Sequence, residues 1–227
     1  MLSVIILYNR QGITQSVFDN LLRFVDINRQ KRIKGFHFKR DALNCLLSDV
    51  IVRSEICKLT GLNNSSLIFG ANEYGKPFLL NCPDIHYNVS HSDEFIAIAL
   101  SDSQVGIDVE FIKPIRIDIA EQFFSPDEVN YIKSGIKPDD KIYRFFEIWT
   151  MKESFVKLKG MGLYLELSSF SVLENSKKGK IFYRRVYYDS NYLCHLCSKK
   201  VQIPDLKLID MKYLLKSVEE NIEKLKR

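Results

Sequence analysis

The spacing of hydrophobic residues along the chain predicts helices and strands in alternating groups. Between Ala42 and Ile51, apolar residues recur every three or four positions, and the pattern stops at Gly61, as in an amphipathic helix that ends at a glycine. Between Val105 and Phe111, apolar and polar residues alternate, as on a strand with one buried face. The same criteria predict helices over residues 14–24, 41–59, 139–159 and 211–226, and strands over residues 2–8, 85–90, 95–100, 105–111, 163–172, 180–188 and 192–198.

A further helix start is marked by the segment Ser125-Pro126-Asp127-Glu128. Serine is a favoured N-cap, proline is favoured at the first helical position, and a glutamate at the third position can close a capping box. We therefore interpret Glu128 as a capping residue whose carboxylate is fully used by the capping box.

The predicted elements follow a similar order twice. Each half, residues 1–113 and residues 114–227, runs through helices first and strands afterwards, and each half has the size of a small domain. The pattern predicts an α+β fold made of two similar halves packed face to face.

Composition narrows the class of protein. Of the 227 residues, 46% are hydrophobic and 27% are charged, which predicts a folded core with a solvated surface. The apolar run at residues 2–8 is too short to span a bilayer and lacks a basic leader, so we expect a cytoplasmic protein without membrane association. A net charge of +5 suits a partner with several negative charges, but it is too modest to indicate a nucleic-acid binder.

Five cysteines in a chain without an export signal predict reduced thiols. Cys194 and Cys197 have the spacing of half a zinc site or of a redox pair. The chain has no second ligand pair at similar spacing, and both residues lie in a predicted strand. We interpret them as small buried residues.

Two carboxylates lie on one face of the predicted strand 105–111. Because side chains alternate along a strand, Asp108 and Glu110 face one way, while Ile107 and Val109 face the other. Neighbouring carboxylates repel each other unless a positive charge lies between them, and Mg²⁺ typically takes one or two carboxylates plus substrate phosphates. The pair is therefore either a magnesium site or two ordinary solvent-facing residues.

Glu153 and Lys157 lie one turn apart on the predicted helix 139–159 and share a face. One interpretation is a surface ion pair in which Lys157 also stabilises the helix C-terminus. The other makes Glu153 a third metal ligand or a base, and Lys157 a phosphate clamp or an acid.

Two loops carry further candidates. The segment 88–92 places Ser90 and His91 at a strand end, where the histidine is either a satisfied turn residue or a phosphate ligand. In the segment 75–77, Lys76 is either part of a surface turn rigidified by Pro77 or a point charge for an anionic ligand.

Taken in order, these motifs resemble the surfactin-type 4′-phosphopantetheinyl transferases. The resemblance extends from about Arg29 to about Val172. It is carried by G-K-P at 75–77, N-V-S-H-S at 88–92, G-I-D-V-E at 106–110, F-F-S-x-x-E at 123–128, W-T-M-K-E-S-F-V-K at 149–157 and G-M-G-L at 160–163.

The resemblance implies an α+β fold whose two halves are related by a pseudo-twofold axis, with coenzyme A in the cleft between them. It implies a monomeric enzyme that transfers the 4′-phosphopantetheine arm of coenzyme A to a serine of an acyl or peptidyl carrier protein. The residues that match the family's magnesium ligands are Asp108, Glu110 and Glu153. Those that match its coenzyme A contacts are Arg29, Arg32, Lys76, Pro77, Ser90, His91, Asp108 and Lys157.

In the mechanism that this resemblance implies, Mg²⁺ bridges the diphosphate, and Lys157 stabilises the departing 3′,5′-ADP. Glu153 takes the proton of the carrier serine, directly or through a metal-bound water.

Two other functions stay open when only the residues are considered. One is a metal-dependent phosphodiesterase or nuclease, although restriction-type nucleases have E-x-K on the strand itself. The other is a non-catalytic module that binds coenzyme A or a carrier protein.

Overall fold

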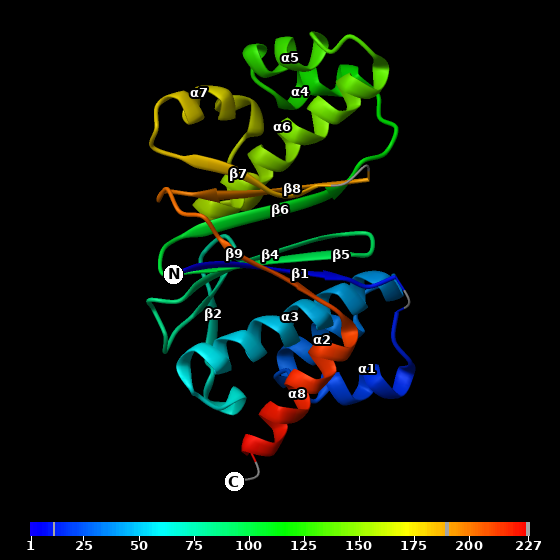
Figure 1. The fold of residues 1–227 in the computed structure, drawn as a ribbon, viewed down its shortest axis with the longest axis vertical. Helices are drawn as coiled ribbons and strands as arrows, with labels where there is room; N and C mark the ends of the chain where they lie inside the picture. The colour runs from blue at the N-terminus through cyan, green and yellow to red at the C-terminus, as the bar shows by residue number, and fades with distance from the viewer. Residues whose placement is uncertain (11, 189–190, 226–227) are drawn as a thin grey trace.

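The computed structural model describes residues 1–10, 12–188 and 191–225 and has a mixed α+β architecture (Figure 1). The helices are α1 Gln15–Leu22, α2 Ile27–Lys34, α3 Lys39–Thr60, α4 Ala120–Phe123, α5 Pro126–Lys133, α6 Pro138–Lys159, α7 Val172–Lys177 and α8 Met211–Leu225. The strands are β1 Leu2–Tyr8, β2 Phe69–Ala71, β3 Pro77–Leu79, β4 His86–Ser92, β5 Phe95–Ser101, β6 Val105–Phe111, β7 Phe182–Tyr188, β8 Tyr192–Ser198 and β9 Asp205–Ile209. The α+β class predicted from the sequence is confirmed.

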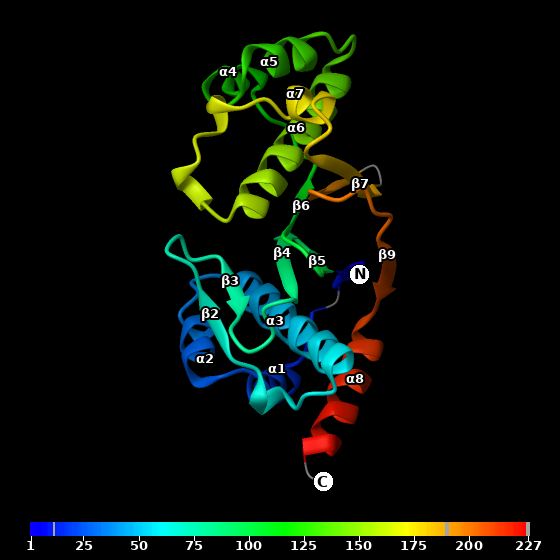
Figure 2. The ribbon, with the colours of Figure 1, turned by 90° about the vertical axis from the view of Figure 1, so that its left-hand side faces the viewer.

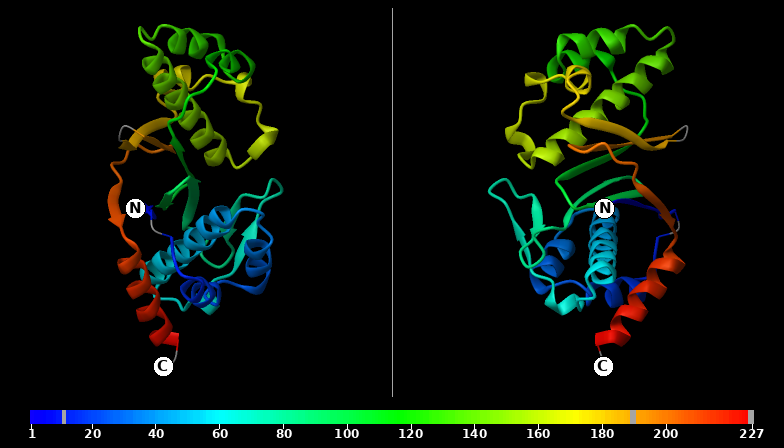
Figure 3. Two further views of the ribbon diagram at one scale, coloured as in Figure 1. Left: turned by 90° about the vertical axis from the view of Figure 1, so that its right-hand side faces the viewer. Right: turned by 60° about the vertical axis from the view of Figure 1, so that its left-hand side comes forward.

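Two sheets lie next to each other in the middle of the molecule, and helices cover their outer faces (Figure 1). The lower sheet has the strand order β4-β5-β1-β9, and the upper sheet has the order β6-β8-β7. Below the lower sheet lie α1, α2, α3 and α8, and above the upper sheet lie α4 to α7 (Figures 1 and 3). A separate hairpin, β2–β3, stands beside these layers and reaches towards the end of α6 (Figure 2).

An apolar layer joins the two sheets. Val4 and Phe95 from the lower sheet belong to the same buried cluster as Ile107, Val109 and Leu196 from the upper sheet. The lower sheet also packs against α3 on its other face, so β5 is buried along its whole length. This explains why residues 95–100 are apolar at consecutive rather than alternate positions.

The chain crosses between the two layered bodies more than once. Strand β6 follows β5 in sequence, but it pairs with β8 in the upper sheet. Strand β9 returns to the lower sheet and runs parallel to β1, with Val4 opposite Leu206, and α8 packs against α3. Neither β9 nor α2 was predicted from the sequence, because a strand of mainly exposed residues and a strongly basic segment carry little periodic apolar signal.

The strand predicted at residues 163–172 is wrong. This segment forms short 3-10 turns at Gly162–Tyr164 and Leu167–Ser169 and then enters α7. Gly162 has a positive φ of 53°, and the carbonyl groups of Leu167 and Phe170 accept hydrogen bonds from the Lys152 amine at 2.9 and 2.6 Å. A side chain of α6 therefore binds backbone groups that a strand would have paired with a neighbour.

Among the described residues, none of the helices is both long and apolar enough to cross a bilayer.

Candidate active site

The site is built where α6 crosses β6, and Gly106 makes this approach possible. A Cβ atom at Gly106 would lie 1.9 Å from the carbonyl oxygen of Ser154 and 2.5 Å from the backbone nitrogen of Leu158. Only a residue without a side chain lets the helix backbone lie this close to the strand. As a result, the face of α6 that carries Glu153 and Lys157 lies against the acidic face of β6.

Asp108 lies at the centre of this contact. Its side chain is almost fully buried, and its Oδ1 atom accepts hydrogen bonds from Lys157 Nζ at 2.6 Å and from Ser90 Oγ at 2.8 Å. Lys157 Nζ also donates to Ser90 Oγ at 2.9 Å. Asp108 Oδ2 is buried but has no hydrogen-bond partner among the described residues. A buried carboxylate oxygen without a partner is energetically unfavourable and indicates a missing positive or donor group.

The three acidic residues influence one another. Burial raises the pKa of Asp108, whereas Lys157 and Ser90 oppose this shift. Burial and the nearby charge of Asp108 raise the pKa of both Glu110 and Glu153. Trp149, one turn before Glu153 on α6, forms a hydrogen bond that lowers the pKa of Glu110. The structure therefore places Glu110 and Glu153 within electrostatic range of the buried Asp108.

No group of three His, Cys, Asp or Glu side chains within residues 1–10, 12–188 and 191–225 is arranged closely enough to hold a metal ion. The positive charge next to Asp108 is the Lys157 ammonium group. The residues nevertheless fit a divalent cation, because Asp108 Oδ2 has no partner among the described residues and because the buried carboxylates of Glu110 and Glu153 lie within electrostatic range of Asp108.

Two cavities meet at Lys157. The first, of about 490 Å³, is bordered by Lys76, Pro77, Glu153 and Lys157 at one end and has mainly apolar walls elsewhere. The second, of about 270 Å³, is lined by basic and polar residues, namely Arg29, Arg32, Ser48, Ser90, His91 and Lys157, together with Phe36, Cys45 and Val89. Apart from Asp108, which lines neither cavity, the predicted coenzyme A contacts line one or both of these cavities.

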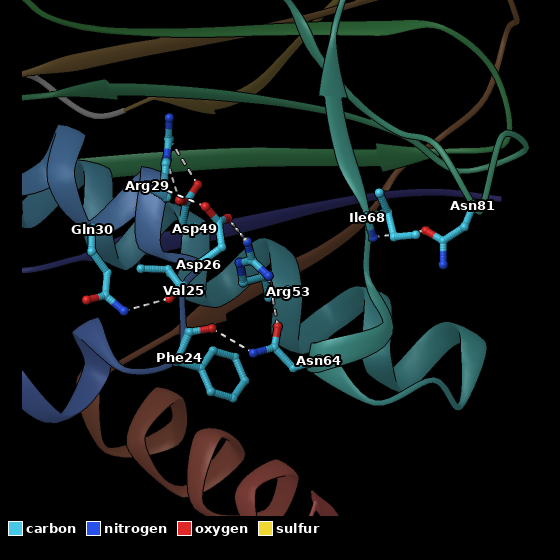
Figure 4. Close-up of polar contacts among 10 residues, drawn as sticks. All are labelled: Phe24, Val25, Asp26, Arg29, Gln30, Asp49, Arg53, Asn64, Ile68 and Asn81. Atoms are coloured by element: carbon cyan, nitrogen blue, oxygen red, sulfur yellow. Dashed lines mark hydrogen bonds and ion pairs between the residues drawn. The ribbon is translucent and has the colours of Figure 1, made fainter.

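Within the second cavity, Arg29 is held by a carboxylate of the protein itself. Its guanidinium group forms a two-point ion pair with Asp49 of α3, in which Nε pairs with Oδ2 and NH2 lies 2.9 Å from Oδ1 (Figure 4). Asp26, the N-cap of α2, accepts the backbone N–H of Arg29 and binds Arg53 at 2.7 Å. These contacts fix α2 on α3, and they offset part of the Arg29 charge.

Lys76 has a role that its position in a loop did not indicate. Its Nζ atom donates to the carbonyl oxygens of Lys157 at 2.6 Å, Val105 at 3.2 Å and Leu158 at 3.3 Å. Burial lowers its pKa to about 8. The amine therefore caps the C-terminal end of α6, where unpaired carbonyl groups favour a positive charge. The structure does not show it pointing into open space as a free charge for a ligand.

Two residues near the site were missed in the sequence. Ser92 Oγ donates to Glu110 Oε2 at 2.8 Å, and Asn88 Oδ1 accepts the backbone N–H of Ile107 at 2.8 Å. The available signal was the repetition of polar residues at every second position from residue 88 to residue 92, which predicts a single polar face on a strand.

Glu128 closes a capping box as predicted, with its Oε2 atom accepting the backbone N–H of Ser125 at 3.0 Å. The prediction that capping uses the whole carboxylate is wrong. Glu128 also forms a fully buried ion pair with Lys152 at 2.7 Å and accepts the backbone N–H of Val172 at 2.7 Å.

Cys194 and Cys197 are free, buried residues of β8, as predicted. His195, which lies between them, bonds to Thr150 Oγ1 through Nδ1 at 2.7 Å, and burial lowers its pKa to about 3. This cluster belongs to the packing between β8 and α6.

Comparison with known proteins agrees with this architecture. Residues 104–210 match the model of the 4′-phosphopantetheinyl transferase superfamily, and residues 13–103 match the model of the N-terminal part of a 4′-phosphopantetheinyl transferase. The chain belongs to the 4′-phosphopantetheinyl transferase superfamily, which confirms the resemblance seen in the motifs.

Bacterial relatives are similar over most of the chain. It is 35% identical to the 4′-phosphopantetheinyl transferase ffp of Bacillus subtilis, over 92% of this chain and 98% of the relative. It is 38% identical to the 4′-phosphopantetheinyl transferase Sfp of Bacillus subtilis strain 168, over 73% of this chain and 74% of the relative. It is 34% identical to the 4′-phosphopantetheinyl transferase gsp of Aneurinibacillus migulanus, over 86% of this chain and 85% of the relative.

Proposed function

We propose that this chain transfers the 4′-phosphopantetheine arm of coenzyme A to a serine of an acyl or peptidyl carrier protein and releases 3′,5′-ADP. The observation that carries the proposal is the position of Lys157. It pairs with the buried Asp108 at 2.6 Å, and it borders both the cavity lined by Arg29 and Arg32 and the cavity bordered by Glu153. A diphosphate bound beside Lys157 would meet the positive charges of Lys157 and of the cavity that Arg29 and Arg32 line.

Coenzyme A is proposed to lie between the two layered bodies. Arg32 and His91 line the basic cavity, which suits the 3′-phosphate of the nucleotide. Arg29 also lines this cavity, and Asp49 offsets only part of its positive charge. Ser90 lies at the boundary between the cavities, next to Lys157. Lys76 and Pro77 form the wall of the larger cavity, where Lys76 supports the end of α6.

Asp108, Glu110 and Glu153 are the proposed ligands of a Mg²⁺ ion. When bound, the ion would offset the charge of the diphosphate and polarise the phosphorus under attack. The unpartnered oxygen of Asp108 and the raised pKa values of Glu110 and Glu153 support this assignment.

Proton movement is assigned to two residues of α6. The serine oxygen forms a bond to the pantetheine-bearing phosphorus while the bond from that phosphorus to the nucleotide phosphate oxygen breaks. Glu153, whose pKa is raised by burial and by Asp108, takes the serine proton. Lys157 donates to the departing 3′,5′-ADP, whose negative charge increases as the bond breaks.

Mass spectrometry of several apo-carrier domains incubated with the protein, coenzyme A and magnesium tests this proposal. We expect a gain of one phosphopantetheine per carrier, and a loss of about 100-fold or more in rate for Glu153→Gln and Lys157→Ala. Glu174→Gln, an exposed change on α7, is the matched control and should keep the parent rate. Unmodified carriers, or parent rates in both site variants, would refute the proposal.

A labelled oligonucleotide incubated with the protein and magnesium separates the transferase from a metal-dependent nuclease. Cleavage that is lost in Glu153→Gln, without carrier modification, would favour the nuclease. Coenzyme A binding without turnover would favour a non-catalytic module.

The two halves, residues 1–113 and residues 114–227, are proposed to be related by a pseudo-twofold axis, although β6 of the first half lies in the upper body and β9 and α8 of the second half lie in the lower body. Helices α3 and α6 support this, because each has 22 residues, ends at a glycine in the left-handed conformation and covers one sheet.

We propose a monomer because the acids and Lys157 come from one chain. The five free cysteines support a reducing, cytoplasmic setting. The modest net charge of +5 supports the proposal that neither nucleic acids nor membranes are partners.

A further inference from the structure

Strands β4 and β6 lie side by side although they belong to different sheets. Because β6 is at the edge of the upper sheet, the N–H groups on its outer side need other partners. Side chains at every second position of β4 supply these partners. The bonds run from the Ile107 N–H to Asn88 Oδ1 at 2.8 Å, from the Val109 N–H to Ser90 Oγ at 3.2 Å, and from the Phe111 N–H to Ser92 Oγ at 3.0 Å.

Both serines of this series use their hydroxyl groups in two kinds of bond with β6. Each accepts an N–H from β6 and donates its own proton to the acid that precedes that N–H in sequence. Ser90 Oγ donates to Asp108 Oδ1 at 2.8 Å, and Ser92 Oγ donates to Glu110 Oε2 at 2.8 Å. A hydroxyl group has one proton and two acceptor sites. Since the backbone bond already fixes the oxygen, the proton has a fixed direction towards the carboxylate.

We propose that Ser92 is a positioning residue for Glu110, and that its hydroxyl holds this carboxylate in the orientation in which it binds a divalent cation. The inference rests on the proposed function, because that function makes Glu110 a metal ligand. Ser92 acts only through Glu110. It is the counterpart, two residues further along β4, of the contact between Ser90 and Asp108.

The physical reason lies in the repulsion between the strand acids. Asp108 and Glu110 face the same side of β6, and Glu110 can avoid Asp108 by rotating about its side-chain bonds. The Ser92 hydroxyl binds one carboxylate oxygen, Oε2, and so resists this rotation together with the hydrogen bond from Trp149. Outer partners of this kind typically change metal affinity by 10- to 100-fold when they are removed.

The test measures Mn²⁺ binding directly, through the paramagnetic resonance signal of free Mn²⁺, with 3′,5′-ADP present and without turnover. We expect Ser92→Ala to raise the Mn²⁺ concentration at half saturation about 10-fold, and Ser92→Thr, which keeps the hydroxyl, to stay within about twofold of the parent. Asn88→Ala is the matched control, since it removes a bond of the same series that touches no acid. It should lower the unfolding temperature but leave the Mn²⁺ midpoint unchanged.

A parent-like Mn²⁺ midpoint in Ser92→Ala would overturn the proposal, as would an equal shift in Asn88→Ala or no recovery in Ser92→Thr. The parent protein separates this outcome from a failure of the proposed function. If the parent modifies carriers but Ser92→Ala binds Mn²⁺ normally, only the role of Ser92 fails. If the parent binds Mn²⁺ and modifies no carrier, the transferase fails, and the Mn²⁺ midpoints of the three variants still decide the role of Ser92.

Discussion

Helix α6 carries two lysine–carboxylate pairs that differ in how completely their polar atoms are satisfied. The first joins Lys152 to Glu128, and both side chains are fully buried. Lys152 Nζ binds Glu128 Oε2 at 2.7 Å and also reaches the carbonyl groups of Leu167 and Phe170. Glu128 Oε1 accepts the backbone N–H of Val172 at 2.7 Å. Every charged atom of this pair therefore has a partner within the protein.

The second pair joins Lys157 to Asp108 and is incomplete. Asp108 is buried, but its Oδ2 atom has no partner among the described residues, and 27% of the Lys157 side chain is exposed, next to two cavities. The two lysines are five positions apart, which places them on different sides of the helix. One side faces the packing around α5 and α7, and the other faces β6.

The comparison shows how the same chemistry serves structure or function. A buried ion pair is stable only when each lone pair and each proton is used, as for Lys152 and Glu128. An unused oxygen next to a partly exposed lysine is unfavourable in the protein alone, and it becomes favourable when a ligand completes the set. The candidate site is therefore distinguished by a carboxylate oxygen that can still accept a bond, rather than by the ion pair itself.

The largest expected effect concerns the complete pair. Lys152→Met should lower the free energy of unfolding by about 3–5 kcal/mol, because it leaves Glu128 buried without its counter-charge. Urea unfolding measures this change. The double variant Lys152→Met/Glu128→Gln should recover part of the loss, since it removes the unpaired charge. If Lys152→Met were as stable as the parent, the proposed difference between the two ion pairs would be wrong.

Removing the lysine of the incomplete pair should affect activity more than stability. For Lys157→Met we expect phosphopantetheine transfer to fall by about 10²–10³-fold, the usual effect of losing one group that stabilises transition-state charge. Its unfolding midpoint in urea, measured with magnesium present, should shift less than that of Lys152→Met. The reverse order of the two midpoints would contradict the comparison.

Gly106→Ala tests the close approach of α6, the helix that carries both lysines, to β6. The added methyl group would overlap the Ser154 carbonyl oxygen, so α6 has to move away from the strand. We expect a loss of about 1–3 kcal/mol in unfolding free energy and a fall in rate of about 100-fold. Gly35→Ala is the control, because a methyl group there meets its nearest atoms at an ordinary 3.4 Å. Parent-like rates in Gly106→Ala would show that the close approach is not needed.

The smallest expected effect concerns His195, which packs against α6, belongs to neither ion pair and makes the stability of the protein depend on pH. His195 is neutral in the folded protein until the pH falls to about 3, whereas the unfolded chain binds a proton near pH 6.5. Stability from this residue is therefore complete above pH 6.5 and is lost as the pH falls from 6.5 towards 3. Between pH 7.5 and 5.0, the parent should lose about 2 kcal/mol more than His195→Gln in urea unfolding. An equal loss in both proteins would be the contrary result.

Much of the fold follows from local patterns. The strand 105–111 and the long helix that carries Glu153 and Lys157 were predicted within a few residues, because strong alternation and helical periodicity survive in any packing. The strand predicted at residues 163–172 failed for the opposite reason. The alternation of Leu163, Leu165 and Leu167 stops after three apolar positions, and the backbone partner of the segment is the Lys152 amine, which lies on another element.

For the candidate site, the sequence alone determined that Asp108 and Glu110 share a face and that Glu153 and Lys157 share another. Both statements depend only on the repeat of a strand or a helix. Tertiary structure decided that these faces meet, that Lys76 caps α6, and that Arg29 is held by Asp49. A side chain's charge can be read in the sequence, but its partner depends on which distant backbone and side-chain atoms folding brings within hydrogen-bond distance.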